Sequence, residues 1–209
     1  MVKRRTLTRE QVIGAARELA NEQGLDKLTM RAISARVGVE APSLYTHVVD
    51  KQDLLDGLAE LIFSEVRVEP SDDPLATRIE MYSRALRQAL LSNAHLASVA
   101  ATRPVVSIST LHMVEQALGE LMEAGLDPQQ SLYILDSLVS FVIGHALAEI
   151  GDDPEFGGHS EDEIAAQRAA LPADQFPNVA ATLGQGRVDR EAEFQFGVGL
   201  LIKGVLDLL

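Results

Sequence analysis

The segment from Leu28 to Lys51, LTMRAISARVGVEAPSLYTHVVDK, restricts the fold of this chain more than any other part of it. It has the pattern of two short helices joined by a tight turn. Gly38 can adopt the positive φ that such a turn requires, and Pro42 suits the first turn of the second helix, where a missing N–H costs little. The pattern predicts a helix-turn-helix, whose second helix enters the major groove of DNA.

Charge is distributed unevenly along the 209 residues. The net charge of −13 alone argues against a nonspecific DNA binder. Residues 1–51 contain nine Lys/Arg and six Asp/Glu, a net of +3, whereas residues 52–209 contain nine and 25, a net of −16. A small basic module on a large acidic body fits a protein that touches phosphate at one end only. A chance imbalance is the alternative that charge alone leaves open.

Composition excludes several other classes of protein. The chain is 46% apolar, which argues against wholesale disorder, and its longest apolar candidate, residues 137–148, suits a buried helix better than a membrane span. The N-terminal MVKRRTLTREQ lacks the apolar stretch of a secretory signal. The absence of cysteine excludes disulfides and thiolate metal sites. We therefore expect a cytoplasmic protein, nucleoid-associated when it binds DNA, with no membrane partner.

The helical signals divide the chain into a small head and a larger body. In the head, over residues 1–68, Thr8 with Gln11 has the pattern of a capping box. Thr29 and Asp50 can each cap a further helix, and Gly24 can end the first one. The break PSDDP at 70–74 separates this head from a body over residues 69–209.

Helical patterns in the body run over roughly 75–93, 95–101, 105–124 and 128–150, and a further apolar stripe ends the chain. No alternating strand pattern is present, so we predict an all-α fold: a helix-turn-helix head of three to four helices and a larger helical body. Residues 151–188 are rich in Gly, Pro and acid, and we expect a mobile loop there with one helix near 161–170.

The head resembles that of the TetR-type transcriptional regulators, with Gly38, Pro42, Leu44, Tyr45, His47 and Lys51 at the family's spacing. In the body, ALLS at 89–92, TRP at 102–104, GLDPQQSLYIL at 125–135 and the C-terminal EFQFGVGLLIKGVLDLL resemble the subgroup that contains the tetracycline repressor. The resemblance covers most of the chain, and residues 151–188 contribute almost nothing to it. It implies a ligand-responsive regulator, a repressor that releases a palindromic operator when a small molecule binds the body.

Carried over position by position, the resemblance assigns DNA contacts to Thr29, Arg31, Ala41, Pro42, Ser43, Tyr45, Thr46, His47 and Lys51. Arg31 can donate to guanine O6/N7 or to a phosphate, and the hydroxyl, imidazole and ammonium groups can donate to phosphate. Ala41 and Thr46 stand where the tetracycline repressor has a glutamine and a tryptophan. We therefore expect shared backbone contacts and a different operator sequence.

Several of these assignments have alternatives. Tyr45 is either a phosphate contact or a core residue packed under Leu44 and Leu54. His47 and Lys51 are either DNA contacts or ordinary surface residues. The basic residues at positions 3–5 are either an arm that reaches a groove or a solvated terminus.

The resemblance also implies that the body forms a two-fold dimer through two long helices, which we expect near 128–150 and 189–209. The first is apolar around most of its circumference, so it has to be buried on several faces. A monomer of this size could bury it internally, which is the alternative to a dimer. Two-fold symmetry fits a palindromic DNA site.

The expected ligand site is a mostly apolar cavity with a few polar anchors. Its predicted residues are Tyr82, Leu86, Thr102, Arg103, Met113, Gln116, Phe141 and His145. Core packing is the alternative for the apolar ones. Arg103 predicts an anionic or carbonyl-bearing ligand, unless it holds a helix C-terminus.

A metal-dependent ligand site is not expected. The tetracycline repressor holds its drug as a magnesium chelate through a histidine and an acidic residue, and Ala100 and Ala148 occupy those positions here. Apolar side chains cannot supply the oxygen or imidazole ligands that a hard cation needs. His95, His112 and His145 could form another metal site, but they are scattered along the sequence, which favours structural or pocket-lining histidines. We therefore expect no tetracycline–magnesium binding, no metal and no cofactor.

Two other classes of function compete with a regulator. An enzyme is disfavoured, because the sequence lacks a Gly-rich phosphate loop, a nucleophile elbow and a His–acid metal spacing. A helical dimer that serves purely as a protein-interaction scaffold would share the apolar helices of the body. Selective binding to a palindromic DNA site would distinguish the regulator from the scaffold.

Overall fold

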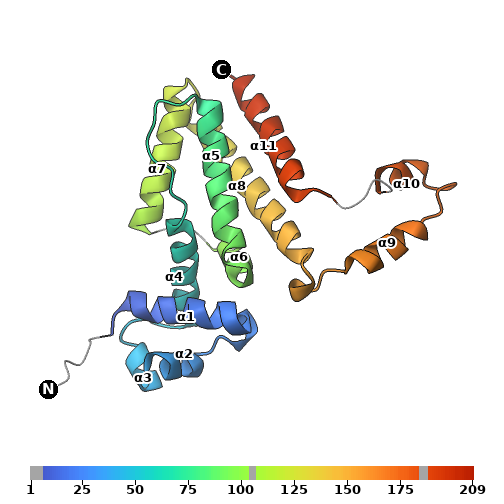
Figure 1. The fold of residues 1–209 in the computed structure, drawn as a ribbon. Coiled ribbons are helices and arrows are strands. Elements are labelled where there is room, and N and C mark those ends of the chain that lie inside the picture. The colour runs from blue at the N-terminus through green and yellow to red at the C-terminus, as the bar shows by residue number, and fades with distance from the viewer. Residues whose placement is uncertain (1–6, 104–106, 184–187) are drawn as a thin grey trace.

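The computed structural model describes residues 7–103, 107–183 and 188–209, and all regular elements within these ranges are helical, as expected (Figure 1). The head contains α1 (Arg9–Gln23), the 3-10 turn η1 (Leu25–Lys27), α2 (Met30–Val37), α3 (Ala41–Leu44) and α4 (Lys51–Ser64). The predicted caps are confirmed: Thr8 and Gln11 form the capping box of α1, Thr29 accepts from the Ala32 N–H, and Asp50 caps α4. Gly24 and Gly38 adopt φ of +84° and +73°.

The second helix of the helix-turn-helix is short. Helix α3 has four residues and continues as a hydrogen-bonded turn, in which the Val48 N–H donates to the Leu44 carbonyl over 3.0 Å. The Thr46 hydroxyl donates to the Ser43 carbonyl over 2.7 Å, a local bond that competes with helix continuation. This turn brings both Leu44 and Val48 into the core, where they are 0% and 1% exposed.

The body is a helical bundle that α4 joins to the head. It contains α5 (Leu75–Leu91), η2 (Ala94–Leu96), α6 (Ala97–Ala101), α7 (Ile108–Glu123), α8 (Pro128–Gly151) and α11 (Arg190–Leu206). Helix α8 packs against α5, α7 and α11, and α4 reaches up from the head to contact α5, α6 and α7 (Figure 1). One cluster of buried apolar residues therefore runs from Val12 and Ile33 in the head to Val142 and Phe194 in the body.

Within residues 151–188, the described part up to residue 183 is more helical than predicted. It includes η3 (Pro154–Phe156), α9 (Glu161–Ala169) and α10 (Pro177–Leu183), which form an arm that extends away from the bundle (Figure 1). The helix expected near 161–170 is present as α9. The expectation of a loop is wrong for α10, because the Ala-containing stretch PNVAATL favours a helix despite its Gly- and Pro-rich surroundings.

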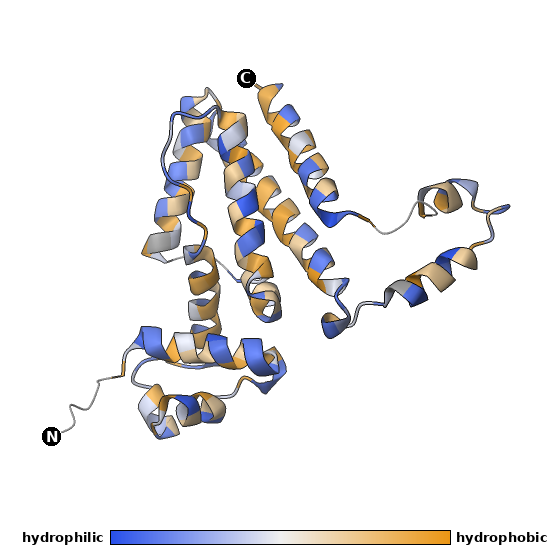
Figure 2. Cartoon of the chain, viewed as in Figure 1, coloured by the Kyte–Doolittle hydropathy of each residue, from blue (hydrophilic) through white to orange (hydrophobic). Residues whose placement is uncertain are grey.

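Helices α8 and α11 are apolar along much of their length (Figure 2). Helix α8 is the one helix in the described ranges that is long and apolar enough to cross a membrane, a test that core helices of soluble proteins also pass. Here its buried residues include Leu138, Val142 and Ala146, which face the bundle. Its outward face carries Tyr133, which is 59% exposed.

Candidate DNA-binding and ligand-binding sites

The nine residues predicted to contact DNA lie at the start of α2, in α3 with its following turn, and at the start of α4. Helices α2 and α3 form the end of the molecule opposite the C-terminus (Figure 1). Seven of the nine side chains are exposed, and Ala41 and His47 are half-buried. Tyr45 is 53% exposed while Leu44 is fully buried. The alternative in which Tyr45 fills the core is therefore excluded, and the geometry leaves its hydroxyl accessible to phosphate.

Ion pairing separates the basic side chains of the head into two groups. Arg9 pairs with Asp53 over 2.7 Å, Arg17 pairs with Glu65 over 2.7 Å, and Arg36 pairs with Glu22 and Glu18. Arg31 and Lys51 have no side-chain partner among the described residues. Their charges are therefore available to DNA, whereas the charges of the paired arginines stabilise the head. The basic residues at positions 3–5 lie outside the described ranges.

A cavity of about 230 Å³ lies between α4, α5, α7 and α8. This volume is below the typical range for ligand sites, which is ~300–1,000 Å³. Its polar lining residues are Tyr82, Ser83, Glu120 and Asp136. The remaining wall is apolar and consists of Phe63, Val66, Leu75, Ile79, Leu86, Met113, Val114, Ala117, Leu121, Leu132, Leu135, Leu138 and Val139.

Three of the eight predicted ligand residues line this cavity: Tyr82, Leu86 and Met113. Gln116 lies next to it and donates to the Glu120 carboxylate over 3.2 Å. The Thr102 hydroxyl donates to the Ser98 carbonyl over 3.0 Å at the end of α6, away from the cavity lining. Sequence reasoning missed the contribution of α4 and the carboxylates of Glu120 and Asp136. Asp136 was detectable in principle, as an acidic residue within the apolar run of α8.

An ion pair between the buried Arg78 and the partly exposed Glu120 lies at one wall of the cavity. Arg78 is 3% exposed, and its guanidinium donates to Glu120 over 2.6 Å, to the Glu69 carbonyl over 2.5 Å and to the Tyr82 hydroxyl over 3.2 Å. Burial would raise the pKa of Glu120, but the hydrogen bonds from Arg78 and Gln116 outweigh it and hold the pKa below its ordinary value. Both groups are therefore charged, and each neutralises the other.

Arg103 does not reach the cavity, which corrects the sequence-based prediction. Its guanidinium donates to the Asp56 carboxylate over 2.5 Å and to the Gln52 carbonyl over 3.2 Å. These contacts join the segment after α6 to the first turns of α4. Arg103 therefore links the body to the head, and the anionic or carbonyl-bearing ligand that it suggested loses its basis.

Phe141 and His145 also lie elsewhere, because their side of α8 faces α11. The His145 ring is 5.2 Å from that of Phe194 and 5.9 Å from that of Phe141. Its Nε2 lies 3.4 Å from a Glu193 carboxylate oxygen, and its Nδ1 lies 3.8 Å from Glu149. His145 therefore belongs to the junction of α8 and α11. No group of three or more potential metal-ligating side chains comes together within the described ranges.

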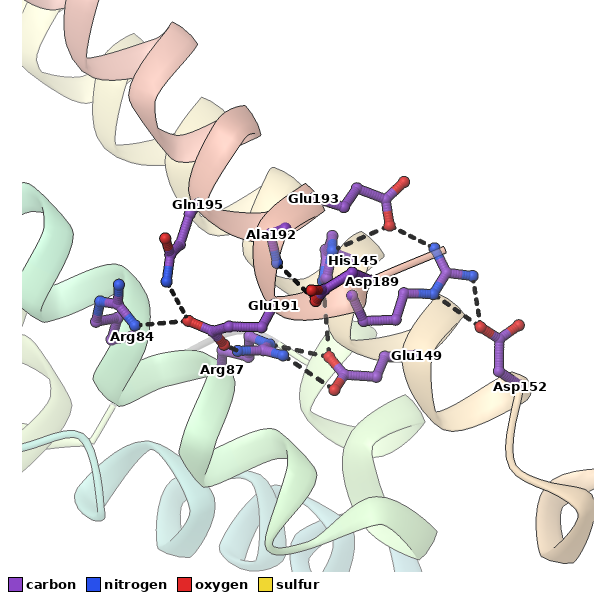
Figure 3. A network of polar contacts seen from close by, with 11 residues as sticks. Arg84, Arg87, His145, Glu149, Asp152, Asp189, Glu191, Ala192, Glu193 and Gln195 are labelled. Atoms are coloured by element: carbon purple, nitrogen blue, oxygen red, sulfur yellow. Dashed lines mark hydrogen bonds and ion pairs between the residues drawn. The ribbon is translucent and has the colours of Figure 1, made fainter. Parts of the chain in front are cut away.

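A network of ion pairs joins α5, α8 and the start of α11 around this histidine (Figure 3). Arg87 donates two hydrogen bonds to Glu149, over 2.9 and 3.0 Å, and a further one to Glu191. Arg84 donates to Glu191 over 2.8 Å. Hydrogen bonds from Gln195, Arg87 and Arg84 lower the pKa of Glu191 to about 2. The network fixes the start of α11 against the rest of the bundle.

The lowered pKa of Glu191 predicts that Glu191→Gln reduces stability at neutral pH and has no effect in strong acid. A carboxyl group with a depressed pKa in the folded state stabilises the fold above its unfolded pKa. That contribution is lost as the pH falls from 4.5 toward about 2. The effect is modest, because the side chain is 46% exposed. Thermal unfolding midpoints measured across this pH range check it.

Glu115→Gln is the control, since Glu115 is exposed and has no side-chain partner among the described residues. A gap between parent and Glu191→Gln that stays constant down to pH 2 would contradict this role of the carboxylate.

Comparisons with known proteins agree with this arrangement. Residues 12–58 match the family model of bacterial regulatory proteins of the tetR family, and residues 69–209 match that of the tetracyclin repressor-like C-terminal domain. The tetracycline repressor protein class C of Escherichia coli is 30% identical over 203 residues, which cover 95% of this chain and 90% of that protein.

Two solved structures from Streptomyces coelicolor also resemble this chain. A possible TetR family transcriptional regulator has 33% identity and a TM-score of 0.83, covering 96% of this chain and 100% of its own. The TetR family protein ActR, solved in complex with actinorhodin, has 27% identity and a TM-score of 0.86, with 97% and 98% covered.

Proposed function

The chain belongs to the TetR family and is a ligand-responsive DNA-binding transcriptional regulator rather than an enzyme, and we propose that it is a homodimeric repressor with a palindromic operator. A small, largely apolar effector that fills the cavity between α4, α5, α7 and α8 releases the operator. The protein acts in the cytoplasm, on the nucleoid when it is bound to DNA.

One observation carries this proposal: α4 belongs to both sites. Lys51 is its first residue and lies on the predicted DNA-binding face, while Phe63 at its other end lines the cavity together with Val66. A helix of 14 residues is ~21 Å long. An effector that repacks Phe63 and Val66 therefore shifts the position of Lys51 and of the head. In a dimer this changes the separation of the two heads. The effector therefore shifts the population from the state that binds the operator to the state that does not.

The outward faces of α8 and α11 support the dimer. Large apolar side chains are exposed on both helices and just after α11: Tyr133 on α8, Phe196, Leu200 and Leu206 on α11, and Leu208 after it. Around Gly199 and Gly204 a Cβ atom would meet nothing within 4 Å, so another helix has room to approach closely. Apolar surface of this extent marks an interaction site. The family relationship and the two-fold symmetry of palindromic operators favour a second copy of this chain as the partner.

The relatives support a ligand for the body without naming the one bound here. ActR has been solved with actinorhodin, and the curated relatives include tetracycline repressors. In this chain Ala100 is buried and does not line the cavity, and Ala148 has no metal-binding group. We therefore propose an effector other than a tetracycline–magnesium chelate, with no metal and no cofactor.

Gel-shift and footprinting experiments on the DNA that flanks the gene test the proposal. We expect site-specific, salt-sensitive protection of a palindrome, and its loss when a compound found by thermal-shift screening is added. If selection from genomic DNA enriches no sequence at all, the repressor proposal fails and the protein-interaction scaffold takes its place.

The link between Arg103 and α4 predicts that Arg103→Ala weakens communication between the two sites. The substitution removes the contacts to Asp56 and Gln52. We expect the effector-induced change in operator affinity to fall by about 0.5–2 kcal/mol, that is roughly 2- to 30-fold. Operator titrations with and without the screened compound measure this coupling.

Asp56→Asn should weaken the coupling in the same direction, since it removes the other partner of the ion pair. Arg168→Ala, a change in α9, serves as the control. Full coupling in Arg103→Ala would mean that the signal passes through the cavity wall of α4 alone.

A further inference from the structure

The charges around the cavity restrict the class of effector. Glu120 and Asp136 are the acidic residues of its wall, and no Lys, Arg or His is found among the described residues that line it. Arg78 is the basic group behind this wall, and its guanidinium is already occupied by Glu120, the Glu69 carbonyl and Tyr82. The pair of Arg78 and Glu120 contributes no net charge. The carboxylate of Asp136 therefore makes the net charge of the cavity lining negative.

Asp136 is a carboxylate without a partner. It lies on α8 at the exposed edge of the cavity, and no hydrogen bond or ion pair engages its side chain within the described residues. The neighbours one helical turn away, Leu132 and Ser140, are uncharged. The carboxylate is therefore exposed at the edge of a mostly apolar cavity, and no charged side chain among the described residues pairs with it.

We propose that the effector is an amphipathic cation, with an apolar body that fills the cavity and a protonated amine or similar group that pairs with Asp136. This inference rests on the proposed function only in placing the effector in this cavity. Electrostatic attraction strengthens as apolar atoms displace water from around a charge pair. The body of the protein, with −16 over residues 52–209, adds a negative field that attracts cations.

The same geometry disfavours anions and neutral apolar molecules as ligands. An anion would be repelled by Asp136 and would have to displace Glu120 from Arg78, which would leave a charge unpaired near the protein interior. A neutral apolar molecule would fit the walls but would gain nothing from Asp136. An amphipathic cation would contact the apolar walls and pair with the Asp136 carboxylate.

Three probes of matched shape test the proposal on the full-length protein: phenylbutylamine, phenylbutanol and phenylbutyrate. Calorimetry or ligand-observed NMR gives their affinities. We expect the amine to bind about three- to tenfold more tightly than the alcohol, and the carboxylate to bind most weakly. Asp136→Asn should abolish the preference for the amine and leave the affinity for the alcohol unchanged. Asp174→Asn, an exposed acid in the arm, is the matched control and should keep the preference.

Three outcomes would overturn the proposal. The first is equal binding of amine and alcohol to the parent protein. The second is an amine preference that survives Asp136→Asn. The third concerns Lys203, an exposed residue in the last turn of α11: amine binding that appears only after Lys203→Gln would mean that Asp136 pairs with this lysine of a second copy. An amine preference with no effect of the amine on operator binding would support cation binding at Asp136 and would count against the proposed effector role of the cavity.

Discussion

Phe196→Asp is expected to convert the protein into monomers and to lower its affinity for a full palindromic operator by about 10²- to 10⁴-fold. Phe196 is 70% exposed on α11, on the face that also carries Leu200. In a dimer, a carboxylate at position 196 would be buried against the second copy without a cation to pair with. Burying an unpaired charge is unfavourable enough to dissociate the interface. The two heads would then bind as independent units and lose the advantage of a shared operator. Sedimentation velocity and fluorescence anisotropy with the selected operator measure both effects.

A half-site and a matched variant separate dimerisation from folding. On DNA with a single half-site, parent and Phe196→Asp should bind with equal affinity, since the head is unchanged. Ile108→Asp places the same charge on an exposed apolar residue of α7 and should leave both the dimer and the operator affinity intact. If Phe196→Asp stays dimeric and binds the full operator normally, the α8–α11 face is not the dimer interface.

The helices of this fold were predictable because their signals are local. The Thr8–Gln11 box, the Thr29 and Asp50 caps and the positive φ of Gly38 each depend on residues within one turn of the chain. The length of α3 was not predictable in the same way. It depends on burying Leu44 and Val48 in the hydrophobic core, which is a tertiary requirement.

The two sites differ in how much of them the sequence could reveal. The DNA-binding face is formed by one continuous segment, so a pattern of spacings identified it. The cavity is formed by four separate helices, and the residues that line it depend on how those helices rotate against each other. Arg103 and His145 show this: the first turns toward α4 and the second toward α11. Neither direction is encoded in the residues next to them.

Arg31→Ala is expected to weaken operator binding by about 1–3 kcal/mol at each half-site, and thus by ~2–6 kcal/mol for a dimer that loses the contact twice. Arg31 lies near the start of α2, is exposed, and has no side-chain partner within the described ranges. Its guanidinium pays no cost of breaking an internal ion pair when it turns to DNA. Anisotropy titrations over a range of salt concentrations measure the loss.

Arg36→Ala is the matched control, because Arg36 belongs to the same helix but pairs with Glu22 and Glu18. We expect it to change stability slightly and operator affinity little. If Arg31→Ala and Arg36→Ala weaken operator binding equally, the net charge of the head, rather than the free guanidinium of Arg31, determines the affinity.

The salt dependence then decides which atoms Arg31 contacts. If it binds phosphate, the loss is similar on every sequence and the slope of log affinity against log salt falls by about one per half-site. If it donates to guanine O6 and N7, the loss is confined to operators with that base, and a change of the base alone reproduces it. Lys51→Ala provides the reference for a phosphate contact, since a single ammonium on an exposed helix start carries charge but no bidentate geometry. If Arg31→Ala changes neither the operator affinity nor its salt dependence on any operator variant, Arg31 does not contact DNA.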